Sequence, residues 1–503
     1  MERVPRDHMT VDALLLQAHL VMARDPAAGV ALATSLLQAR HSPRHNAEAL
    51  LILASGLSRV GDFDEADLRF AEAERAAESD PDLVAKIALF RSVSLMLQGR
   101  IPEIETLIAL IRGSKDPSIR AQGEMMHAVL LRQREQYRQQ IPVLLRGLFE
   151  LRAAKSGNVW VRCSLLHMLA EIVVEYWEPT LATIVEDEFQ AIDWHDEIAD
   201  WHFFISRALS WWYALSGDSL GAFRYLKRAV ALPVRDALRV LNHADRAYLA
   251  QAQGEMGWFD QELSEAAELS RTVPWETESD ARDDASIALA SLAELYASID
   301  VARASEYLAR FRSFRRHLSS ANTRRHDRID AAFVAGVRGI VTAALGKLGE
   351  ATRVLTGSFE IYDEIGYDWR AGKVALTLAS VTSDPQYLEL ARHKLARYPS
   401  SWLAGAYREQ AERIGIADVI PGVKLTPAQW RVFHLLADGY SLAEVAAHLG
   451  RSVNTVRNHA VALYTALGVH SRQELRALAA KFENKGTLAQ VGQRENGASH
   501  LEL

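Results

Sequence analysis

One short stretch of the chain, from Val453 to Leu467, carries side chains that could contact the base edges of duplex DNA. Counted in helical steps of three and four residues, its polar and small side chains fall on one face. These outward residues are Asn454, Arg457, Asn458, Val461 and Thr465. Arg can bond twice to guanine, Asn can pair with adenine, and Val or Thr can contact the thymine methyl group. The predicted chemistry is therefore recognition in a major groove.

Other residues of this stretch have different expected partners. Four polar or basic side chains could reach the phosphates of the DNA backbone, namely Arg451, Ser452, Thr455 and His459. The opposite face predicts a buried apolar stripe, which consists of Val453, Val456, Ala460, Leu463 and Leu467. The stretch has the amphipathic pattern of a helix that packs on one side and meets a ligand on the other.

The helices that would position these residues begin with a repeated pattern. Thr426–Gln429, Ser441–Glu444 and Ser471–Glu474 each have the S/T-x-x-E/Q form, in which two side chains cap the first turn of a helix. Pro427 suits the first position of the first helix, and Gly439 suits its end. The sequence therefore predicts short helices with sharply defined ends.

A glycine turn joins the second and third of these helices. The second is expected from Leu442 to Leu449, Gly450 supplies the turn, and Ser452 caps the third, which ends before Gly468. Two helices joined by a short turn containing glycine form a helix-turn-helix. Such motifs also occur as packing or dimerisation units, so the shape alone does not establish DNA binding.

The strings LTP, GYSLAEVAAHLGRSVNTVRNH and LGVHSRQEL resemble the LuxR-type DNA-binding domain of bacterial transcription regulators. The resemblance implies that Thr455, Arg457, Asn458 and Val461 face DNA and that the helix after Ser471 mediates dimerisation. The apolar stripe of that helix consists of Leu475, Leu478, Ala479 and Phe482. We therefore expect a homodimer on DNA.

The domain departs from the family pattern at several positions. Gln429 and Arg431 stand where the family usually has acidic residues, and Thr465 and Ala466 stand where it usually has basic ones. Val461 replaces a residue that is often polar or basic. Because these departures remove phosphate contacts, we expect the isolated domain to bind DNA weakly.

Composition is typical of a globular protein without a membrane span. Of the 503 residues, 49% are hydrophobic and 24% are charged, and no apolar run approaches the ~18 residues of a membrane helix. The first residues do not follow the pattern of a secretory signal peptide. Cys163 is the only cysteine, which excludes disulfides within the chain and fits a reducing cytoplasm. A cytoplasmic protein is expected.

The net charge of −7 is unevenly distributed. From Pro421 onward there are nine Lys or Arg and six Asp or Glu, a net of +3, so the preceding residues carry −10. An acidic body with a basic end would direct one end toward a duplex.

Residues 11–415 show almost only helical patterns, and these patterns recur. Glycine turns are expected at Gly61 and Gly99, and again at Gly217 and Gly257, separations of 38 and 40 residues. These segments resemble degenerate tetratricopeptide repeats. The predicted fold is all-α: a TPR-like α-solenoid of antiparallel helix pairs, followed by a four-helix LuxR-type domain over 420–483 and a disordered tail over 484–503.

This architecture resembles the carboxyl half of the large ATP-binding LuxR regulators of the maltose-regulator type. Their ATPase half has no counterpart here, because no G-x-x-x-x-G-K-[ST] string occurs and Leu348 stands where ALGKLG would need Ser or Thr. No phosphoacceptor or acyl-homoserine-lactone domain is expected either. The concave surface of the solenoid is predicted to bind a small-molecule, peptide or protein effector.

Two clusters in the solenoid have alternative interpretations. Five tryptophans could line a ligand pocket or form core: Trp177, Trp194, Trp201, Trp211 and Trp212. Among them, His195, Asp196, Asp200 and His202 could bind a metal or could form a solvated face, and we predict no metal site. A basic cluster could contact DNA or an anion, or pair with nearby acids; it comprises Arg310, Arg312, Arg315, Arg316, Arg324, Arg325 and Arg328, with His317 and His326.

The sequence as a whole predicts a bacterial, sequence-specific transcription regulator that binds double-stranded DNA and senses an effector or partner through its helical repeats. No enzyme site, cofactor site or membrane contact is expected. The alternative is a scaffold that binds a protein or peptide and uses the terminal module only to dimerise.

Overall fold

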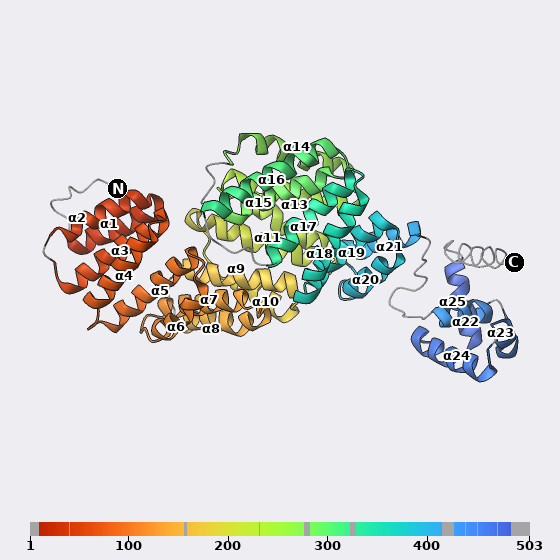
Figure 1. The fold of residues 1–503 in the computed structure, drawn as a ribbon. Helices are drawn as coiled ribbons and strands as arrows, with labels where there is room; N and C mark the ends of the chain where they lie inside the picture. Colours follow the sequence, from red (N-terminus) through yellow and green to blue (C-terminus); the bar gives the residue numbers. More distant parts are fainter. Residues whose placement is uncertain are drawn as a thin grey trace. The chain divides into compact units, whose positions relative to one another are not determined.

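The computed structural model describes residues 10–39, 41–154, 158–230, 232–275, 282–321, 328–414, 427–437, 439–449, 451–469 and 471–483. Within these residues the regular elements are α-helices, numbered α1 to α25, and short 3-10 turns (Figure 1). The predicted all-α class is confirmed. The chain divides into two compact units, Met1–Val374 and Ala375–Leu503. The proposed boundary near residue 420 and the tail over 484–503 lie outside the described residues.

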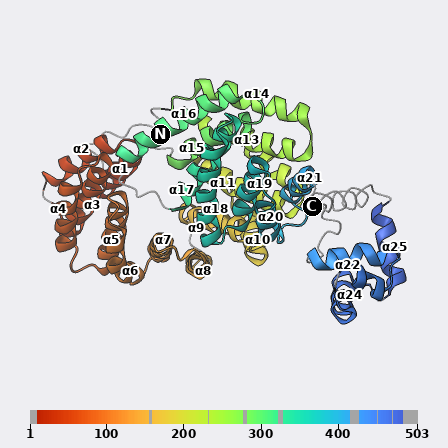
Figure 2. The same ribbon diagram turned by 45° about the vertical axis from the view of Figure 1, so that its right-hand side comes forward.

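The first unit consists of helices packed in consecutive pairs (Figures 1 and 2). The first members of these pairs, which we call the odd-numbered layer, are α1 (Val11–Arg24), α3 (Pro43–Val60), α5 (Pro81–Leu97), α7 (Pro117–Gln133), α9 (Val159–Tyr176), α11 (Ala199–Ser216), α13 (Asp236–Gln253), α15 (Arg282–Tyr296) and α17 (Arg328–Ala344). The second members are α2 (Pro26–Leu37), α4 (Phe63–Ala76), α6 (Ile104–Arg112), α8 (Gln140–Ala153), α10 (Pro179–Gln190), α12 (Ser219–Val230), α14 (Met256–Thr272), α16 (Val301–Ala321) and α18 (Leu348–Ile365).

The pairs stack in chain order. From α1 to α17, each odd-numbered helix packs on its own partner and on the next odd-numbered helix of the layer. Each even-numbered helix from α2 to α16 packs on the odd-numbered helix that follows it. This nearest-neighbour pattern is that of an α-solenoid, in which one pair cannot bury its apolar surface without the next. The predicted arrangement of antiparallel helix pairs is therefore confirmed.

Glycines in the left-handed region end several first helices. Gly61, Gly99, Gly217 and Gly254 have φ values between 73° and 90°, which L-residues with a side chain rarely adopt. The prediction of a turn at Gly257 is wrong, because Gly257 lies in the first turn of α14. Gly254 makes the turn, so this repeat is three residues shorter than the glycine pattern suggested.

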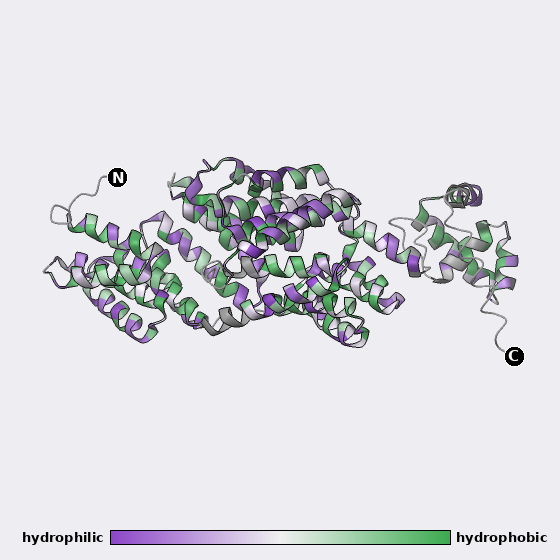
Figure 3. Cartoon of the chain, turned by 90° about the horizontal axis from the view of Figure 1, so that it is seen from above, coloured by the Kyte–Doolittle hydropathy of each residue, from purple (hydrophilic) through white to green (hydrophobic). Residues whose placement is uncertain are grey.

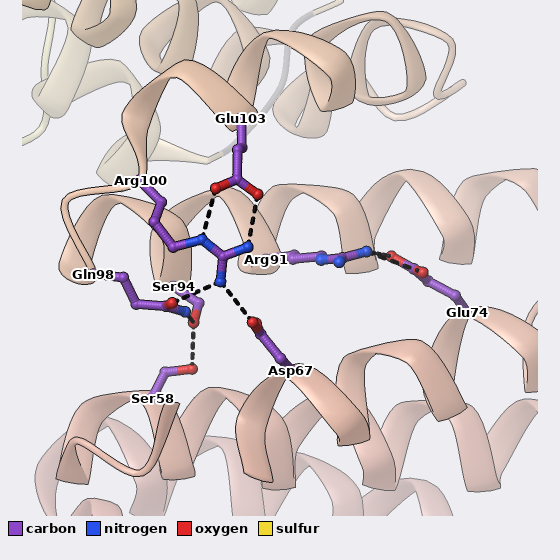
Figure 4. Close-up of polar contacts among 8 residues, drawn as sticks. All are labelled: Ser58, Asp67, Glu74, Arg91, Ser94, Gln98, Arg100 and Glu103. Carbon is purple, nitrogen blue, oxygen red and sulfur yellow. Dashed lines mark hydrogen bonds and ion pairs between the residues drawn. The ribbon is translucent and has the colours of Figure 1, made fainter. Parts of the chain in front are cut away.

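Polar contacts also hold adjacent pairs in register (Figure 4). Arg100, after α5, donates to Asp67 of α4 at 2.7 Å and to Glu103 at 2.6 and 2.7 Å. Ser58 of α3 donates to Ser94 of α5 at 2.7 Å. Because hydrogen bonds between charged groups depend on geometry, such contacts fix how one pair rotates on the next.

The second unit includes α20 (Pro385–Leu395), which packs on α21 (Trp402–Ile414), and a four-helix domain. The domain comprises α22 (Pro427–Ala437), α23 (Leu442–His448), α24 (Val453–Leu467) and α25 (Arg472–Glu483). Its core consists of Val432, Phe433, Leu436, Val445, Ala446, Val456, Ala460, Leu463, Val469 and Leu475. Burial of these side chains supplies the main stabilisation of a module this small.

Hydrophobic and hydrophilic residues alternate along the helices, as expected of helices that bury one face (Figure 3). Among the described residues, none of the helices combines the length and apolar character required to cross a bilayer.

Candidate nucleic-acid interface

Capping side chains set the ends of the helices that frame the candidate interface. At α23, Ser441 Oγ accepts from the Glu444 amide at 3.3 Å, and Glu444 Oε2 accepts from the Ser441 amide at 2.7 Å. The backbone hydrogen bond from Ser441 is the main cause that lowers the pKa of Glu444. At α25, Ser471 Oγ accepts from the Glu474 amide at 3.1 Å. The predicted capping box at α23 is confirmed, whereas Thr426 lies outside the described residues.

The candidate recognition helix α24 has the predicted limits. Ser452 Oγ accepts from the Thr455 amide at 3.1 Å, and the two hydroxyls lie 2.8 Å apart. Gly468 ends the helix with φ 62°. Before the cap, the Arg451 amide donates to the carbonyl of Ala446 at 2.9 Å, which joins the turn to α23. The helix is thus held at both ends by its own sequence.

One face of α24 packs on α22 and α23. Val456, Ala460 and Leu463 are buried, and Leu467 is half-buried. The prediction that Val453 belongs to this buried stripe is wrong, because its side chain is 39% exposed. Val453 is the first residue of the helix and precedes the turn that meets the core, so helical spacing alone overestimates its burial.

The opposite face of α24 is exposed along its length. Exposed side chains are those of Arg451, Ser452, Asn454, Thr455, Arg457, Asn458, Val461 and Thr465, whereas His459 is half-buried. Arg457 donates to Asn454 Oδ1 at 3.2 Å. Thr465 donates to the carbonyl of Val461 at 3.0 Å, so its hydroxyl is directed along the helix. The structure therefore places all the predicted contact residues on one helix and on the two residues that precede it.

This arrangement suits a groove of duplex DNA. A helix of this length extends about 22 Å and is narrow enough to enter the major groove. Its first turn has backbone N–H groups without partners within the helix, and these attract phosphate. The bond between Arg457 and Asn454 orients the guanidinium before any ligand arrives, which lowers the entropy lost on binding.

A residue that sequence analysis missed holds the fourth helix in place. Arg472 of α25 donates to the carbonyl of Gly439, which lies between α22 and α23. Gly439 has φ 104°, a left-handed backbone conformation that residues with a side chain rarely adopt. The only available sequence signal was a basic residue beside the Ser471 cap, and that signal does not identify the distant carbonyl.

The predicted dimerisation stripe is only partly available to a second copy. Leu475 is 0% exposed and lies in the core of its own domain, so its assignment to a dimer contact is wrong. Leu478 is half-buried and packs against the same core. The side chains of Ala479 and Phe482 lie outside those that the structure describes. A helix that closes a small core has fewer apolar residues left for a partner.

The five tryptophans of the solenoid make ring contacts with several different partners. Trp177 lies against Trp212 at 4.2 Å between ring centroids, and Trp194 stacks on His202 at 4.4 Å. Trp201 meets Trp160 edge to face at 5.2 Å, and Trp211 stacks on Trp369 at 5.9 Å. These contacts on four different partners correspond to packing between helices.

The acidic and histidine residues near these tryptophans have other partners. Burial lowers the pKa of His202 to about 4, and Asp200 pairs with Arg235 at 3.2 Å. Among the residues that the structure describes, no three His, Cys, Asp or Glu side chains are placed to hold a metal ion. In the basic cluster, Arg310 lies 4.0 Å from Glu306, and Arg328 pairs with Glu135 at 2.8 Å. Residues 322–327 of that cluster lie outside the described residues.

Comparison with known proteins distinguishes the two parts of the chain. No curated protein matches the sequence. One solved structure similar to this chain is the TPR domain of P58(IPK), with 12% identity and a TM-score of 0.20, covering 74% of this chain and 99% of that one. A likeness of that size adds nothing to the fold argument. Residues 423–479 match the family described as bacterial regulatory proteins, luxR family. The chain therefore contains a LuxR-family helix-turn-helix domain, in which α23 and α24 are the two helices of the motif.

Proposed function

We propose that this protein is a sequence-specific DNA-binding transcription regulator that acts in the bacterial cytoplasm, as a homodimer on DNA. The observation that carries the proposal is the exposed row of Asn454, Arg457, Asn458 and Val461 on α24, inside the segment that matches the LuxR family. These side-chain types can distinguish base pairs in the major groove. The helical repeats receive the signal, which is a small molecule, a peptide or a protein.

Residues at the start of α24 have a separate role in this proposal. Arg451, Ser452 and Thr455 are exposed beside the helix N-terminus, where phosphate is attracted by charge and by backbone N–H groups. They orient the helix and contribute affinity without sequence preference. The further residues His459 and Thr465 lie along the same helix and complete the proposed contact surface.

The proposal is tested with the full-length chain and duplexes enriched from a random library. We expect one enriched sequence to bind more tightly than a scrambled duplex by a factor of roughly 10³ or more. Affinity for both duplexes should fall linearly on a logarithmic salt scale, because phosphate contacts release counterions. Retention that is equal for all sequences, or absent at low salt, would refute the proposal. Absence would favour the alternative of a dimerising scaffold.

Dimerisation through α25 is part of the same proposal and needs its own variant. Leu478→Asp would test folding and dimerisation together, because Leu478 packs against the domain core. Phe482→Asp is the more useful change, with the unfolding of the domain measured in parallel. We expect lower cooperativity on a full palindromic site and unchanged binding to a half-site. Unchanged cooperativity with an intact fold would exclude α25 as the dimer contact.

A further inference from the structure

A short segment after α18 returns to helices that precede it by more than 70 residues. Gly366 ends α18 with φ 83°, and the chain then enters α19 (Asp368–Thr382). We call Tyr367–Lys373 the returning segment. The returning segment and the residues it contacts all belong to the first unit. The contacted residues lie on the odd-numbered layer and on the turn before α8.

The strongest contact of the returning segment is with a carboxylate at the end of α9. Arg370 Nε lies 2.9 Å from both carboxylate oxygens of Glu175, and Trp369 Nε1 donates to Glu175 Oε2 at 3.1 Å. The Glu175 side chain is only 12% exposed. A buried carboxylate requires such donors, because leaving it without them costs several kcal/mol, on the order of 3–5.

Aromatic and ionic contacts extend this interaction across three more helices. Trp369 stacks on Trp211 of α11 at 5.9 Å between ring centroids. Lys373 Nζ lies 4.9 Å from the ring centroid of Tyr248 of α13 and forms an ion pair with Glu294 of α15. The same short segment therefore contacts α9, α11, α13 and α15.

Tyr367 adds contacts at the other end of the segment. Its ring meets Tyr176 of α9 edge to face at 5.1 Å, and it lies 6.0 Å from Tyr137 in the turn before α8. Burial and the Glu175 carboxylate keep the pKa of Tyr367 well above its ordinary value. The phenol is therefore neutral, and its ring serves as an apolar contact.

These contacts require the odd-numbered layer to curve around the returning segment. Helices pack 8–10 Å apart, so a flat layer would place α9 and α15 about 24–30 Å from each other. The returning segment is only about 10 Å long as a helix. One segment of that length contacts all four helices because their facing sides converge on it. The concave side of this layer is therefore occupied by the chain itself.

The chemistry of the occupied surface defines what it can bind. The layer contributes two carboxylates, Glu175 and Glu294, and two aromatic faces, Trp211 and Tyr248. The segment contributes an indole followed by two cations, in the order Trp-Arg-x-x-Lys. Cations bind both to carboxylates and to aromatic faces, so the two surfaces are complementary at three successive positions.

We propose that the surface around Glu175, Trp211, Tyr248 and Glu294 is a peptide-binding site, which the returning segment occupies as an internal ligand. Its external partner is a helical peptide with the same Trp-Arg-x-x-Lys order, which exchanges with the returning segment. The side chains of Arg370 and Lys373 remain 29% and 25% exposed, so water can reach the cations that must be released.

The position of the segment gives this exchange a consequence. The second unit begins at Ala375, two residues after Lys373, and it contains the LuxR-family domain. An external peptide that displaces the segment would release the residues that immediately precede the second unit from their contacts with the first unit. The peptide site is nevertheless independent of the proposed DNA-binding function, because its test measures peptide binding alone.

The test uses the full-length chain and a fluorescent peptide of residues 366–382. In the wild type the internal ligand competes at high effective concentration, so the peptide should bind weakly. A variant with Trp369→Ala, Arg370→Ala and Lys373→Ala frees the site and should bind the peptide roughly ten- to hundredfold more tightly, because hydrogen bonds to charged groups contribute about 1.5–3 kcal/mol. Adding Glu175→Gln and Glu294→Gln to this variant should abolish the gain.

Two controls make the outcome decisive. A peptide that carries Glu at the positions of Arg370 and Lys373 should not bind any variant. Circular dichroism shows whether the triple variant is folded. If it is not, Lys373→Gln alone gives the same comparison with a smaller gain in peptide affinity, because that side chain is partly exposed. A folded variant that binds the peptide no better than the wild type, or binds both peptides equally, overturns the proposal.

Discussion

Two arginines of this protein show how differently one side chain is used in its two units. Arg457 lies on the exposed face of α24 and donates to Asn454, three residues before it on the same helix. Arg370 donates to Glu175, which precedes it by 195 residues, and lies over the ring of Trp369 at 4.5 Å. The first guanidinium is held by a neutral amide and the second by a carboxylate.

The two arginines differ in whether an external ligand can bind them without first displacing a partner. A guanidinium that is oriented by a neutral amide keeps its full charge for an external acceptor such as a base or a phosphate. A guanidinium paired with a carboxylate has its charge compensated, and an external ligand must first replace that partner. Local contacts thus prepare α24 for binding, whereas long-range contacts keep the surface around Glu175 occupied.

The largest effect should come from the core beneath α24. Phe433→Ala removes a fully buried ring and should destabilise the four-helix domain by about 3–5 kcal/mol, with loss of DNA binding. Urea unfolding followed separately for the two units should show the first unit unchanged. Val461→Ala, at an exposed position of α24, is the control for stability. Loss of stability in both units would show that α24 does not depend on local packing alone.

A smaller effect is expected where the returning segment meets α9. Glu175→Gln keeps the shape of the side chain but removes the charge that Arg370 requires, so it should destabilise the first unit by about 1–3 kcal/mol. Glu171→Gln is a matched change on the same helix at a side chain that is half exposed, and it should have little effect. Equal unfolding midpoints for the two variants would show that the Glu175 contact contributes no more than a surface pair.

Substitutions on the outward face of α24 should weaken DNA binding and leave the stability of the domain unchanged. Arg457→Ala or Asn458→Ala should cost about 1–3 kcal/mol at the preferred duplex and relax base preference there. Arg451→Ala should weaken binding to all duplexes alike. Arg476→Ala on α25 removes the same charge from an exposed site and is the control. If Arg457→Ala and Arg451→Ala reduce specific and non-specific binding by the same factor, the assignment of base and phosphate contacts is wrong.

Sequence reasoning predicted α24 well because every signal for it was local. The Ser452 cap, the Gly468 end and the spacing of Val456 and Leu463 all lie within one helix. The prediction for Val453 was wrong because helical spacing shows which face of a helix a residue is on. It does not show whether a neighbouring helix extends far enough to cover that residue. Leu475 was misassigned for a related reason, since an apolar stripe does not say whether it faces the domain's own core or a second copy.

The returning segment could not be predicted from the same rules. Helical repeats were visible in the sequence, but the path of the layer results from small rotations between successive pairs. The contact between Arg370 and Glu175 depends on the accumulated curvature from α9 to α18. Trp211 was noticed among the tryptophans, whereas its partner Trp369 lies outside that stretch of sequence and was not singled out. Complementary charges 195 residues apart leave no periodic signal.

The effect that is smallest near neutral pH should be a pH dependence confined to the first unit. Burial lowers the pKa of His202 on α11 to about 4, from an ordinary value of 6.5, and its ring stacks on Trp194. The unfolded chain therefore binds a proton at a higher pH than the folded one. The stability that neutral His202 contributes is complete above pH 6.5 and falls as the pH decreases toward 4. His202→Phe should keep the stacked ring and flatten this part of the unfolding profile. His195→Gln, at an exposed site in the loop before α11, is the control change. Neither His202 nor His195 belongs to the four-helix domain. That domain should therefore unfold with the same pH profile in both variants. A changed profile for that domain would mean that the two units are coupled more strongly than the contrast between Arg457 and Arg370 implies.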